Sequence, residues 1–280
     1  MIKKAVVVGI DKYQNPQWNL QGCALDATIM SGMLQDHFGF PGDNIRLVLD
    51  NRATKANILD RLRWLVQDAK AGDVLAFFYA GHGSQVRDRN GDELEDQIDE
   101  ILCPHDLSWD DPLTDDILHE YFSKVPEGVN LTVVFDCCHS GTATRSLFVP
   151  VDADGKVIGE PEYKKIRYIT PPVDIEHRAR GLSLPVQPIG GTSVGKASHI
   201  LLAACKSNQE AQEKTFQGQT RGAFSFFMGE ALKRDNWDIT NKGIYEHTLI
   251  RLKDNGFIQI PQLECPEAYL EKKLFASFLE

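Results

Sequence analysis

Long apolar runs are missing from this sequence of 280 residues. A membrane-spanning helix needs roughly 18 consecutive apolar residues. The nearest candidate is the short run at residues 5–10, which ends at Asp11 and Lys12 and has no small-residue cleavage pattern behind it. We therefore expect this run to form a first buried strand and not a signal peptide, and we expect no membrane partner.

The sequence also has fewer basic than acidic residues, and its cysteines lack the spacing of a metal site. Lys and Arg number 30 against 40 for Asp and Glu, which gives a net charge of −10. Proteins that bind a phosphate backbone usually carry the opposite sign, so we expect no nucleic-acid partner. The six cysteines contain neither a Cys-x-x-Cys pair nor a zinc-type spacing. This pattern predicts free thiols in a protein of the cytoplasm.

Short apolar runs alternate with helical patterns along the chain, which predicts an α/β fold with a parallel sheet. The predicted strands lie at residues 4–10, 45–49, 74–79, 131–135, 199–205 and 257–260. We expect a single domain over residues 1–280. Its parts are a first unit at 1–141, an irregular surface connector at 142–197 with recurring prolines and basic residues, and a second unit at 198–280.

Two of the predicted strands end in residues that can do chemistry. Gly-His-Gly at 81–83 follows the strand at 74–79, and Asp-Cys-Cys-His at 136–139 follows the strand at 131–135. Ligands of open parallel sheets bind beyond the carboxyl ends of the strands. A cysteine nucleophile and a histidine can work as a pair there, and the Gly83 amide is free to face an oxyanion.

The alternation of side chains along a strand separates the two neighbouring cysteines. Cys138 shares a side with Asp136, whereas Cys137 lies on the other side. We expect Cys138 to be the exposed nucleophile and Cys137 to pack in the interior, with His139 pointing away. The alternative is that both cysteines are buried and inert and that the Gly-His-Gly turn is structural.

The segments YAGHG at 79–83 and FDCCHSG at 135–141 resemble the two sequence motifs of metacaspases and orthocaspases, which are caspase-like cysteine peptidases. The resemblance extends over roughly residues 4–148 and 198–265. It implies a three-layer αβα caspase–haemoglobinase fold with a mostly parallel central sheet. It also implies a catalytic dyad of His82 and Cys138, with the backbone amides of Gly83 and Cys138 holding the oxyanion.

The same resemblance implies cleavage after Arg or Lys in protein or peptide substrates. The matching pocket positions are Cys23, Asp26, Asp136 and Ala80, the last standing where many relatives have serine. Two carboxylates in such a pocket attract a cation, by about 4 kcal/mol per close pair at an intermediate dielectric. The alternative for Asp26 is a solvated charge on a helix face.

No cofactor is required for the chemistry that the resemblance implies, but many metacaspases need calcium. The candidate ligands by motif position are Asp99, Asp115 and Asp116, since calcium prefers hard oxygen donors. A fourth family aspartate falls near Arg145 here, which argues against the usual site. The alternative is a set of carboxylates at a helix N-terminus, where the helix dipole favours them.

The basic connector contains sites that fit the implied specificity. We expect self-cleavage between residues 142 and 197, at Lys164, Lys165 or Arg167 first, in a protein that is a monomer. Two alternatives stay open: a connector that is never cut, and a weak or inactive caspase-like protein that binds peptides or regulates a partner. A cysteine phosphatase is excluded because position 144 is Thr, and nucleotide-binding glycine motifs are missing.

Overall fold

The fold was analysed in a computed structural model. It describes residues 1–87, 98–138, 147–148, 162–163, 165–173, 175, 199–206 and 209–279. Predictions that fall on residues 88–97, on 139–146 or on Lys164 lie outside the described residues.

The centre of the molecule is a six-stranded sheet with the order β14-β11-β7-β3-β1-β2. Only the β11–β14 pair is antiparallel, and the other neighbours run parallel. The strands are β1 (Lys3–Gly9), β2 (Ile45–Leu49), β3 (Val74–Ala80), β7 (Asn130–Asp136), β11 (Ile200–Ala203) and β14 (Gln262–Glu264). The sheet therefore joins strands from both ends of the chain.

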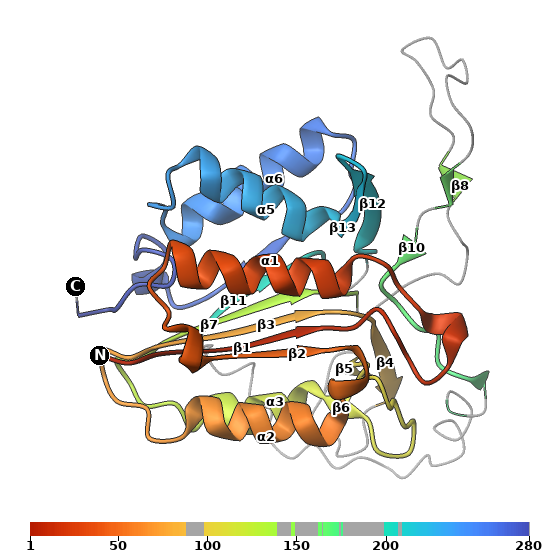
Figure 1. Cartoon of the computed structure of the whole chain (residues 1–280), viewed down its shortest axis with the longest axis horizontal. Helices are drawn as coiled ribbons and strands as arrows, with labels where there is room; N and C mark the ends of the chain where they lie inside the picture. The colour runs from red at the N-terminus through yellow and green to blue at the C-terminus, as the bar shows by residue number, and fades with distance from the viewer. Residues whose placement is uncertain are drawn as a thin grey trace, which may run out of the picture.

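Helices cover both faces of this sheet, which gives the three-layer αβα arrangement that the sequence predicts (Figure 1). One face carries α1 (Cys23–Asp36), α5 (Ala223–Arg234) and α6 (Asn241–Asp254), and the other carries α2 (Lys55–Val66) and α3 (Asp115–Phe122). Four short 3-10 helices lie at Pro16–Trp18, Gly42–Asn44, Asp50–Arg52 and Glu267–Tyr269.

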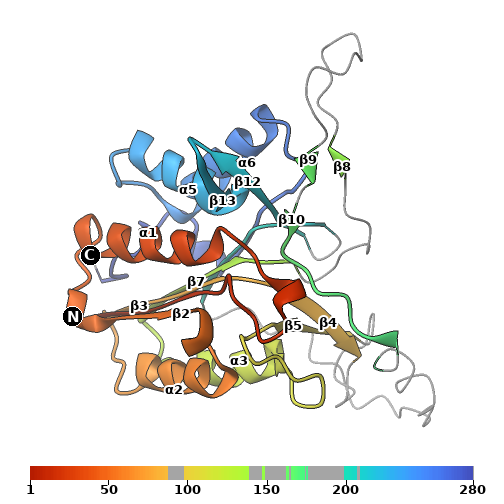
Figure 2. The same cartoon turned by 45° about the vertical axis from the view of Figure 1, so that its right-hand side comes forward.

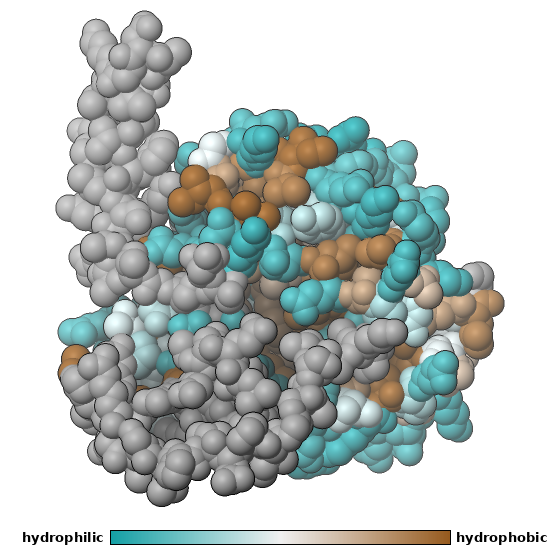
Figure 3. All heavy atoms as spheres, turned by 180° about the vertical axis from the view of Figure 1, so that it is seen from behind, coloured by the Kyte–Doolittle hydropathy of each residue, from teal (hydrophilic) through white to brown (hydrophobic). Residues whose placement is uncertain are grey.

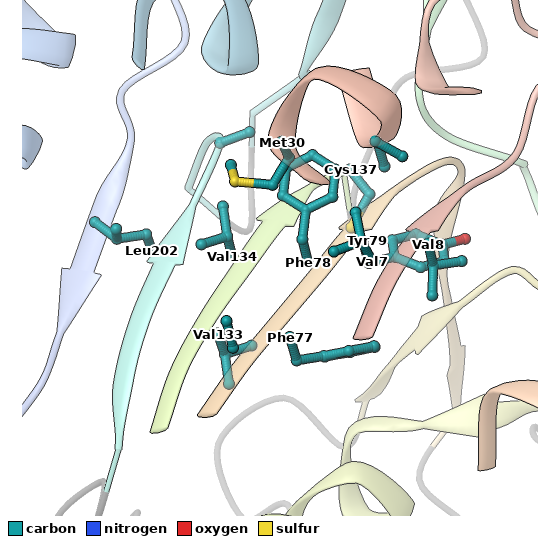
Figure 4. Close-up of a cluster of buried hydrophobic side chains, with 14 of the residues drawn as sticks. Val7, Val8, Met30, Phe77, Phe78, Tyr79, Val133, Val134, Cys137 and Leu202 are labelled. Atoms are coloured by element: carbon teal, nitrogen blue, oxygen red, sulfur yellow. The ribbon is translucent and has the colours of Figure 1, made fainter. Parts of the chain in front are cut away.

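The central strands are continuous apolar runs because the sheet is covered on both faces. All seven residues of β3 are buried. In Figure 4, Phe77 and Val133 lie on one side of the sheet, whereas Phe78, Val134 and Met30 of α1 lie on the other. The alternation of side chains thus builds one core layer on each face.

Side-chain caps fix where two of the helices begin. The Thr54 hydroxyl accepts a hydrogen bond from the Asn57 amide at 3.3 Å, and the Thr114 hydroxyl accepts one from the Ile117 amide at 3.4 Å. A threonine before an apolar helical pattern satisfies otherwise unpaired amides. The helices α2 and α3 contact each other on the same face of the sheet.

Three small sheets complete the described structure. They consist of β4 (Gly83–Arg87), β5 (Ile98–Leu102) and β6 (Leu113–Thr114); of β10 (Lys165–Ile166), β12 (Gln212–Phe216) and β13 (Gln219–Gly222); and of β8 (Leu147–Phe148) with β9 (Glu162–Tyr163). The strands β4 and β10 lie beyond the carboxyl ends of β3 and β7 (Figures 1 and 2).

Two expectations about local structure were wrong. The terminal strand is β14 at 262–264, after the expected 257–260, because the buried Phe257 packs against Phe227 and not into the sheet. In the described part of the connector, which was expected at the surface, Arg167 and Ile169 are buried. That segment has charge partners inside the protein, which composition alone does not reveal.

No described helix is long and apolar enough to cross a bilayer. Figure 3 shows the face opposite that of Figure 1, where hydrophilic residues surround separate hydrophobic patches. Exposed large apolar side chains include Ile250 and Ile258.

Replacing Ile58 by Ala removes a fully buried side chain of α2. We expect the free energy of unfolding to fall by about 2–5 kcal/mol, because a cavity forms under the helix. The matched change Ile250→Ala, at a side chain 50% exposed on α6, should cost less than about 0.5 kcal/mol. Urea unfolding followed by circular dichroism measures both, and equal losses would contradict this description of the core.

Candidate active site

His82 follows β3 and is fixed by two tyrosines. Its amide donates to the Tyr13 hydroxyl oxygen at 2.8 Å, and the Tyr79 hydroxyl donates to its carbonyl oxygen at 2.7 Å. A side chain at Gly81 would come within 2.8 Å of the Tyr79 hydroxyl and 3.0 Å of the Tyr13 hydroxyl. Glycine at 81 therefore lets the two phenols hold the histidine backbone.

The His82 ring is neutral at ordinary pH. Burial lowers its pKa to about 3, and the positive charges of Arg167 and Lys165 add to this effect. Its Nε2 lies 2.7 Å from the Trp18 carbonyl oxygen, so we assign the ring proton to Nε2. The other nitrogen, Nδ1, is buried and makes no hydrogen bond to a described residue.

Cys138, at the end of β7, was expected to be exposed, and that expectation was wrong. Its exposed fraction is 0%, and burial raises its pKa well above that of an ordinary thiol. The sulfur accepts a hydrogen bond from the Ala211 amide at 2.6 Å. The connector residues around Arg167 contact this part of the chain, and the Cys138 amide donates to the Arg167 carbonyl oxygen.

Cys137 packs in the interior, as the sequence predicts. It is 2% exposed and lies among core side chains that include Tyr79 and Phe78 (Figure 4). Burial raises its pKa well above the ordinary value, so it stays a protonated thiol. The described residues do not include His139.

The two backbone amides that were expected to bind an oxyanion converge on one oxygen atom. The Gly83 amide donates to the Arg167 carbonyl oxygen at 3.0 Å, and the Cys138 amide donates to the same oxygen at 3.1 Å. Gly83, which follows His82, and Cys138 thus meet at the Arg167 carbonyl group. This is the geometry that an oxyanion requires, because two preorganised donors point at one carbonyl oxygen.

The Arg167 side chain fills a pocket of three carboxylates. Its Nη2 lies 2.6 Å from Asp26 Oδ2 and 3.2 Å from Glu213 Oε1, and its Nη1 lies 2.9 Å from Asp136 Oδ2. The Arg167 Nη1 also donates to the Asp136 carbonyl oxygen at 3.0 Å. All four side chains are almost completely buried. Asp26 is therefore not a solvated charge on a helix face.

The other expected pocket positions lie in the wall of this arginine pocket. The Cys23 sulfur is 3.5 Å from Glu213 Oε1, and burial raises its pKa well above the ordinary value. Ala80 is fully buried and paired with Asp136 in the β3–β7 register. A side chain at Gly222 would overlap the Asp136 carboxylate and lie 2.6 Å from Arg167 Nη1, so only glycine leaves room for the guanidinium.

Burial and the repulsion between its carboxylates destabilise the pocket when it is empty, and a bound arginine stabilises it. Burial raises the pKa of Asp26 to about 6, with the neighbouring Asp136 adding to it, while Arg167 and Arg221 act in the opposite direction. Arg221 also forms an ion pair with Asp26. Removing one partner of such a buried network leaves an uncompensated charge. A cationic side chain is thus required in the pocket for full charge balance.

The backbone on the amino side of Arg167 is bound as an added strand. Ile166 pairs with Gln212, and Lys165 pairs with Glu213, in antiparallel register. The Arg167 amide then donates to the Ala211 carbonyl oxygen at 3.1 Å. Figure 2 shows β10 beside β12 at this edge. Extended peptides bind to sheet edges in the same way, with main-chain hydrogen bonds supplying affinity and pockets supplying specificity.

Several residues of this site were not predicted from the sequence. They are Glu213, Ala211 and Arg221, together with Ser225, whose amide donates to Asp136 Oδ2 at 3.1 Å. Glu213 lies on β12, and its carboxylate also accepts hydrogen bonds from the Gln21 and Gly22 amides. A short strand that begins after the connector gives no local signal for this role. The pairing of Glu213 with Lys165 of β10 and Gly222 of β13 places it at the pocket.

The three expected metal ligands lie in a different place from the arginine pocket. Asp115 and Asp116 are in the first turn of α3, and Asp99 is on β5, which contacts α3. Burial raises the pKa of Asp115 to about 7, and Glu100, Asp116 and Asp99 raise it further. Among the described residues, these three do not form a group whose ligand atoms all lie within 4.8 Å of one another. Arg145 lies outside the described residues.

A second group of possible ligand atoms adjoins the arginine pocket. Asp11, Cys23 and Glu213 place theirs within 4.8 Å of one another. Asp11 accepts hydrogen bonds from the Cys23 and Ala24 amides, and Glu213 contacts Arg167. These groups already have partners that fix α1 and the pocket, so we assign them a structural role.

Comparison with known proteins decides the family. The model of the metacaspase, peptidase C14 domain matches residues 3–146. This chain belongs to the metacaspase family. Metacaspase-1 of Ajellomyces capsulatus (strain NAm1 / WU24) is 32% identical over 94% of the chain and 79% of the relative. Metacaspase-1 of Schizosaccharomyces pombe is also 32% identical, over 94% of the chain and 67% of the relative.

Solved structures support the fold of this metacaspase. A protein of Geobacter sulfurreducens has a TM-score of 0.70 at 21% identity, over 99% of both chains. Caspase-1 from Spodoptera frugiperda has a TM-score of 0.54 at 13% identity, over 94% of this chain and 86% of the other. The metacaspase therefore has a caspase-like fold, and its family is one of cysteine peptidases.

The buried neutral His82 predicts how stability depends on pH. An unfolded chain protonates this ring near pH 6.5, but the folded chain does so only at about 3. Between these values the unfolded chain binds more protons, so stability is lost as the pH falls from 6.5 towards 3. His82→Gln removes this contribution. The free energy of unfolding of the wild type should therefore fall relative to that of the variant by about 1.4 kcal/mol per pH unit well below 6.5.

Urea unfolding of both proteins between pH 8 and 4.5 measures the difference. We expect it to be constant above pH 7.5. A difference that stays constant over the whole range would contradict a buried, neutral imidazole.

Proposed function

We propose that this metacaspase is a cysteine endopeptidase that cleaves after Arg, and less efficiently after Lys, through Cys138 and His82. The observation that carries the proposal is the position of Arg167. Its guanidinium contacts Asp26, Asp136 and Glu213, while its carbonyl oxygen accepts hydrogen bonds from the Gly83 and Cys138 amides. A substrate arginine in the same position would present its carbonyl carbon for attack.

The proposed reaction is acyl transfer to sulfur. The Cys138 thiol gives its proton to His82, and the sulfur bonds to the carbonyl carbon of the substrate arginine. The amides of Gly83 and Cys138 stabilise the negative charge on the carbonyl oxygen. The carbon–nitrogen bond then breaks as His82 protonates the leaving amine. Water hydrolyses the thioester, releasing the carboxylate and restoring the thiol.

The shape of the pocket favours arginine over lysine. Asp26 and Glu213 approach one terminal nitrogen of the guanidinium, and Asp136 approaches the other. A planar guanidinium serves both sides at once, whereas a lysine ammonium is a single centre. The loss of one charged hydrogen-bond partner corresponds to about a tenfold to hundredfold loss in binding.

Self-processing follows from the same geometry. The bond between Arg167 and Tyr168 is in the position of a substrate bond, and until it is cut the segment excludes other substrates. Of the expected sites, Arg167 is therefore favoured over Lys165, whose backbone pairs with Glu213 one step from the pocket. Cleavage would release the constraint on the connector and free the pocket for a protein or peptide substrate.

Calcium is a second element of the proposal. Asp99, Asp115 and Asp116 would hold the ion, and its charge would stabilise the buried carboxylate of Asp115 in its ionised form. No step of the acyl transfer requires it. Its expected effect is on the position of β5, which pairs with β4 beyond His82.

Matched fluorogenic peptides that end in Arg, Lys or Asp test the specificity. We expect kcat/KM for Arg to exceed that for Lys by about tenfold or more, and we expect no hydrolysis after Asp. Glu213→Gln should lower the Arg-to-Lys ratio, because it removes one charge that contacts a guanidinium nitrogen. Each assay is run with calcium and with a chelator.

Cys138→Ala is the control, and it should abolish hydrolysis of every peptide. Turnover that survives this change would overturn the assignment of the nucleophile. Binding of arginyl peptides by the wild type without any turnover would favour the alternative of a peptide-binding protein.

Intact mass spectrometry tests self-processing at Arg167. The purified wild type should convert to fragments 1–167 and 168–280, and Cys138→Ala should keep one unchanged mass. Arg167→Gln should not be cut at this bond, since a neutral side chain does not balance the three carboxylates. Fragments with a different boundary, or an uncut wild type under conditions where it hydrolyses arginyl peptides, would contradict the proposed processing site.

A further inference from the structure

The chain beyond Arg167 is bound as closely as the chain before it. The Ile169 amide donates to the Gly83 carbonyl oxygen at 3.1 Å. The Ser84 hydroxyl donates to the Ile169 carbonyl oxygen at 2.5 Å. Tyr168 forms an isolated parallel bridge with Gly83. Both polar backbone groups of Ile169 are therefore held by the first two residues of β4, and Figure 2 shows the chain after β10 running towards β4.

Burial alternates along this segment, as it does in an extended chain that lies against a surface. Arg167, Ile169 and Pro171 are buried, Tyr168 is half-buried, and Thr170 is exposed. Ile169 is only 4% exposed and belongs to the apolar core. The side chain two residues after the arginine thus faces the protein interior, whereas Tyr168 is only partly buried against the core and Thr170 is exposed.

We propose that β4 forms a binding subsite for the second residue after the cleaved bond, and that this subsite selects a large apolar side chain. The proposal rests on the proposed function, because it takes the Arg167–Tyr168 bond as the bond in the cleavage position. The substrate class is an extended polypeptide that carries Arg, then a variable residue, then Ile or a similar side chain. A charged side chain at the second position would lose its hydration without a partner.

Gly83 sets the spacing between the two specificity positions. Its amide donates to the Arg167 carbonyl oxygen, and its carbonyl oxygen accepts from the Ile169 amide. One residue of β4 therefore binds the backbone on both sides of the bond. Occupation of the Ile169 position then orients the carbonyl of Arg167 against its two donors, which connects recognition beyond the bond to the chemistry at the bond.

Ser84 gives the subsite a buried hydrogen-bond donor whose position is fixed by β4. Its side chain is 0% exposed, and its hydroxyl meets the Ile169 carbonyl oxygen in the protein interior. Its backbone is paired with Ile101 of β5, so the position of the hydroxyl is set by the β4–β5 pair. A substrate that ends at the cleaved bond would leave this hydroxyl without its partner.

Internally quenched heptapeptides with the sequence Lys-Ile-Arg-Tyr-Ile-Thr-Pro provide the first test. The second residue after Arg is varied from Ile to Gly and to Asp, and each peptide is incubated with the wild-type chain. We expect kcat/KM to fall about tenfold for Gly and further for Asp, because buried apolar area is lost. Equal values for the three peptides would overturn the proposal.

Lys-Ile-Arg-aminocoumarin, which has no residue after the bond, is the reference substrate. Ser84→Ala should lower the ratio of kcat/KM for the Ile heptapeptide to that for the coumarin substrate by about 2- to 10-fold. The matched variant Ser123→Ala also removes a hydroxyl that donates to a carbonyl oxygen, that of Glu120, and should leave the ratio unchanged. An unchanged ratio in Ser84→Ala would contradict a contribution of its hydroxyl to the subsite.

A second experiment does not depend on turnover by the protein. Trypsin cleaves after Arg167 only when the segment leaves the pocket. In the Cys138→Ala chain, mass spectrometry follows the appearance of the fragment that begins at Tyr168. Adding Ile169→Asp should accelerate this cut about tenfold or more, because its anchor is lost. Adding Thr170→Asp, at an exposed position, should change the rate less than about twofold.

The outcomes separate the two proposals. Failure to hydrolyse the coumarin substrate would refute the peptidase function, while the trypsin experiment would still decide whether β4 binds an apolar side chain. Equal rates of tryptic cleavage for the Ile169 and Thr170 variants would overturn the subsite.

Discussion

A buried guanidinium among three carboxylates organises this molecule. Arg167 is completely buried, and the groups that balance its charge come from α1, from the end of β7 and from β12. Charges in the interior are tolerated only when they are paired and hydrogen-bonded. The ion-pair network therefore connects α1, β7 and β12 to the connector. It also fixes the position of the Arg167 backbone.

Burial sets the protonation state of the two proposed catalytic groups. It lowers the pKa of His82, with the charges of Arg167 and Lys165 adding to the effect, and it raises the pKa of the Cys138 thiol. A closed site of this kind is stable as long as the arginine stays in place. The site thus combines a protonated thiol with two backbone amides that point at one carbonyl oxygen.

The sequence was a reliable guide wherever local pattern sets structure. The apolar runs at β3 and β7 had to be buried strands, so His82 and Cys138 had to lie at neighbouring strand ends. Resemblance supplied Asp26 and Asp136 as pocket residues, and both contact the guanidinium. The calcium positions stay a prediction, although Asp115 does lie among other carboxylates.

The remaining features depend on pairings that no local pattern encodes. Glu213 reaches the pocket on β12, which pairs with the short strands β10 and β13, and strands this short have no periodicity to detect. The burial of Cys138 was missed for the same reason. Side-chain alternation along β7 cannot reveal that the Ala211 amide, from a distant part of the chain, contacts its sulfur.

A crystal structure of the intact Cys138→Ala chain tests the central claim most directly. The account predicts electron density for the Arg167 guanidinium against Asp26 and Asp136, with its carbonyl oxygen within hydrogen-bond distance of the amides at positions 83 and 138. A pocket filled by solvent, with the Arg167 segment bound elsewhere, would contradict it.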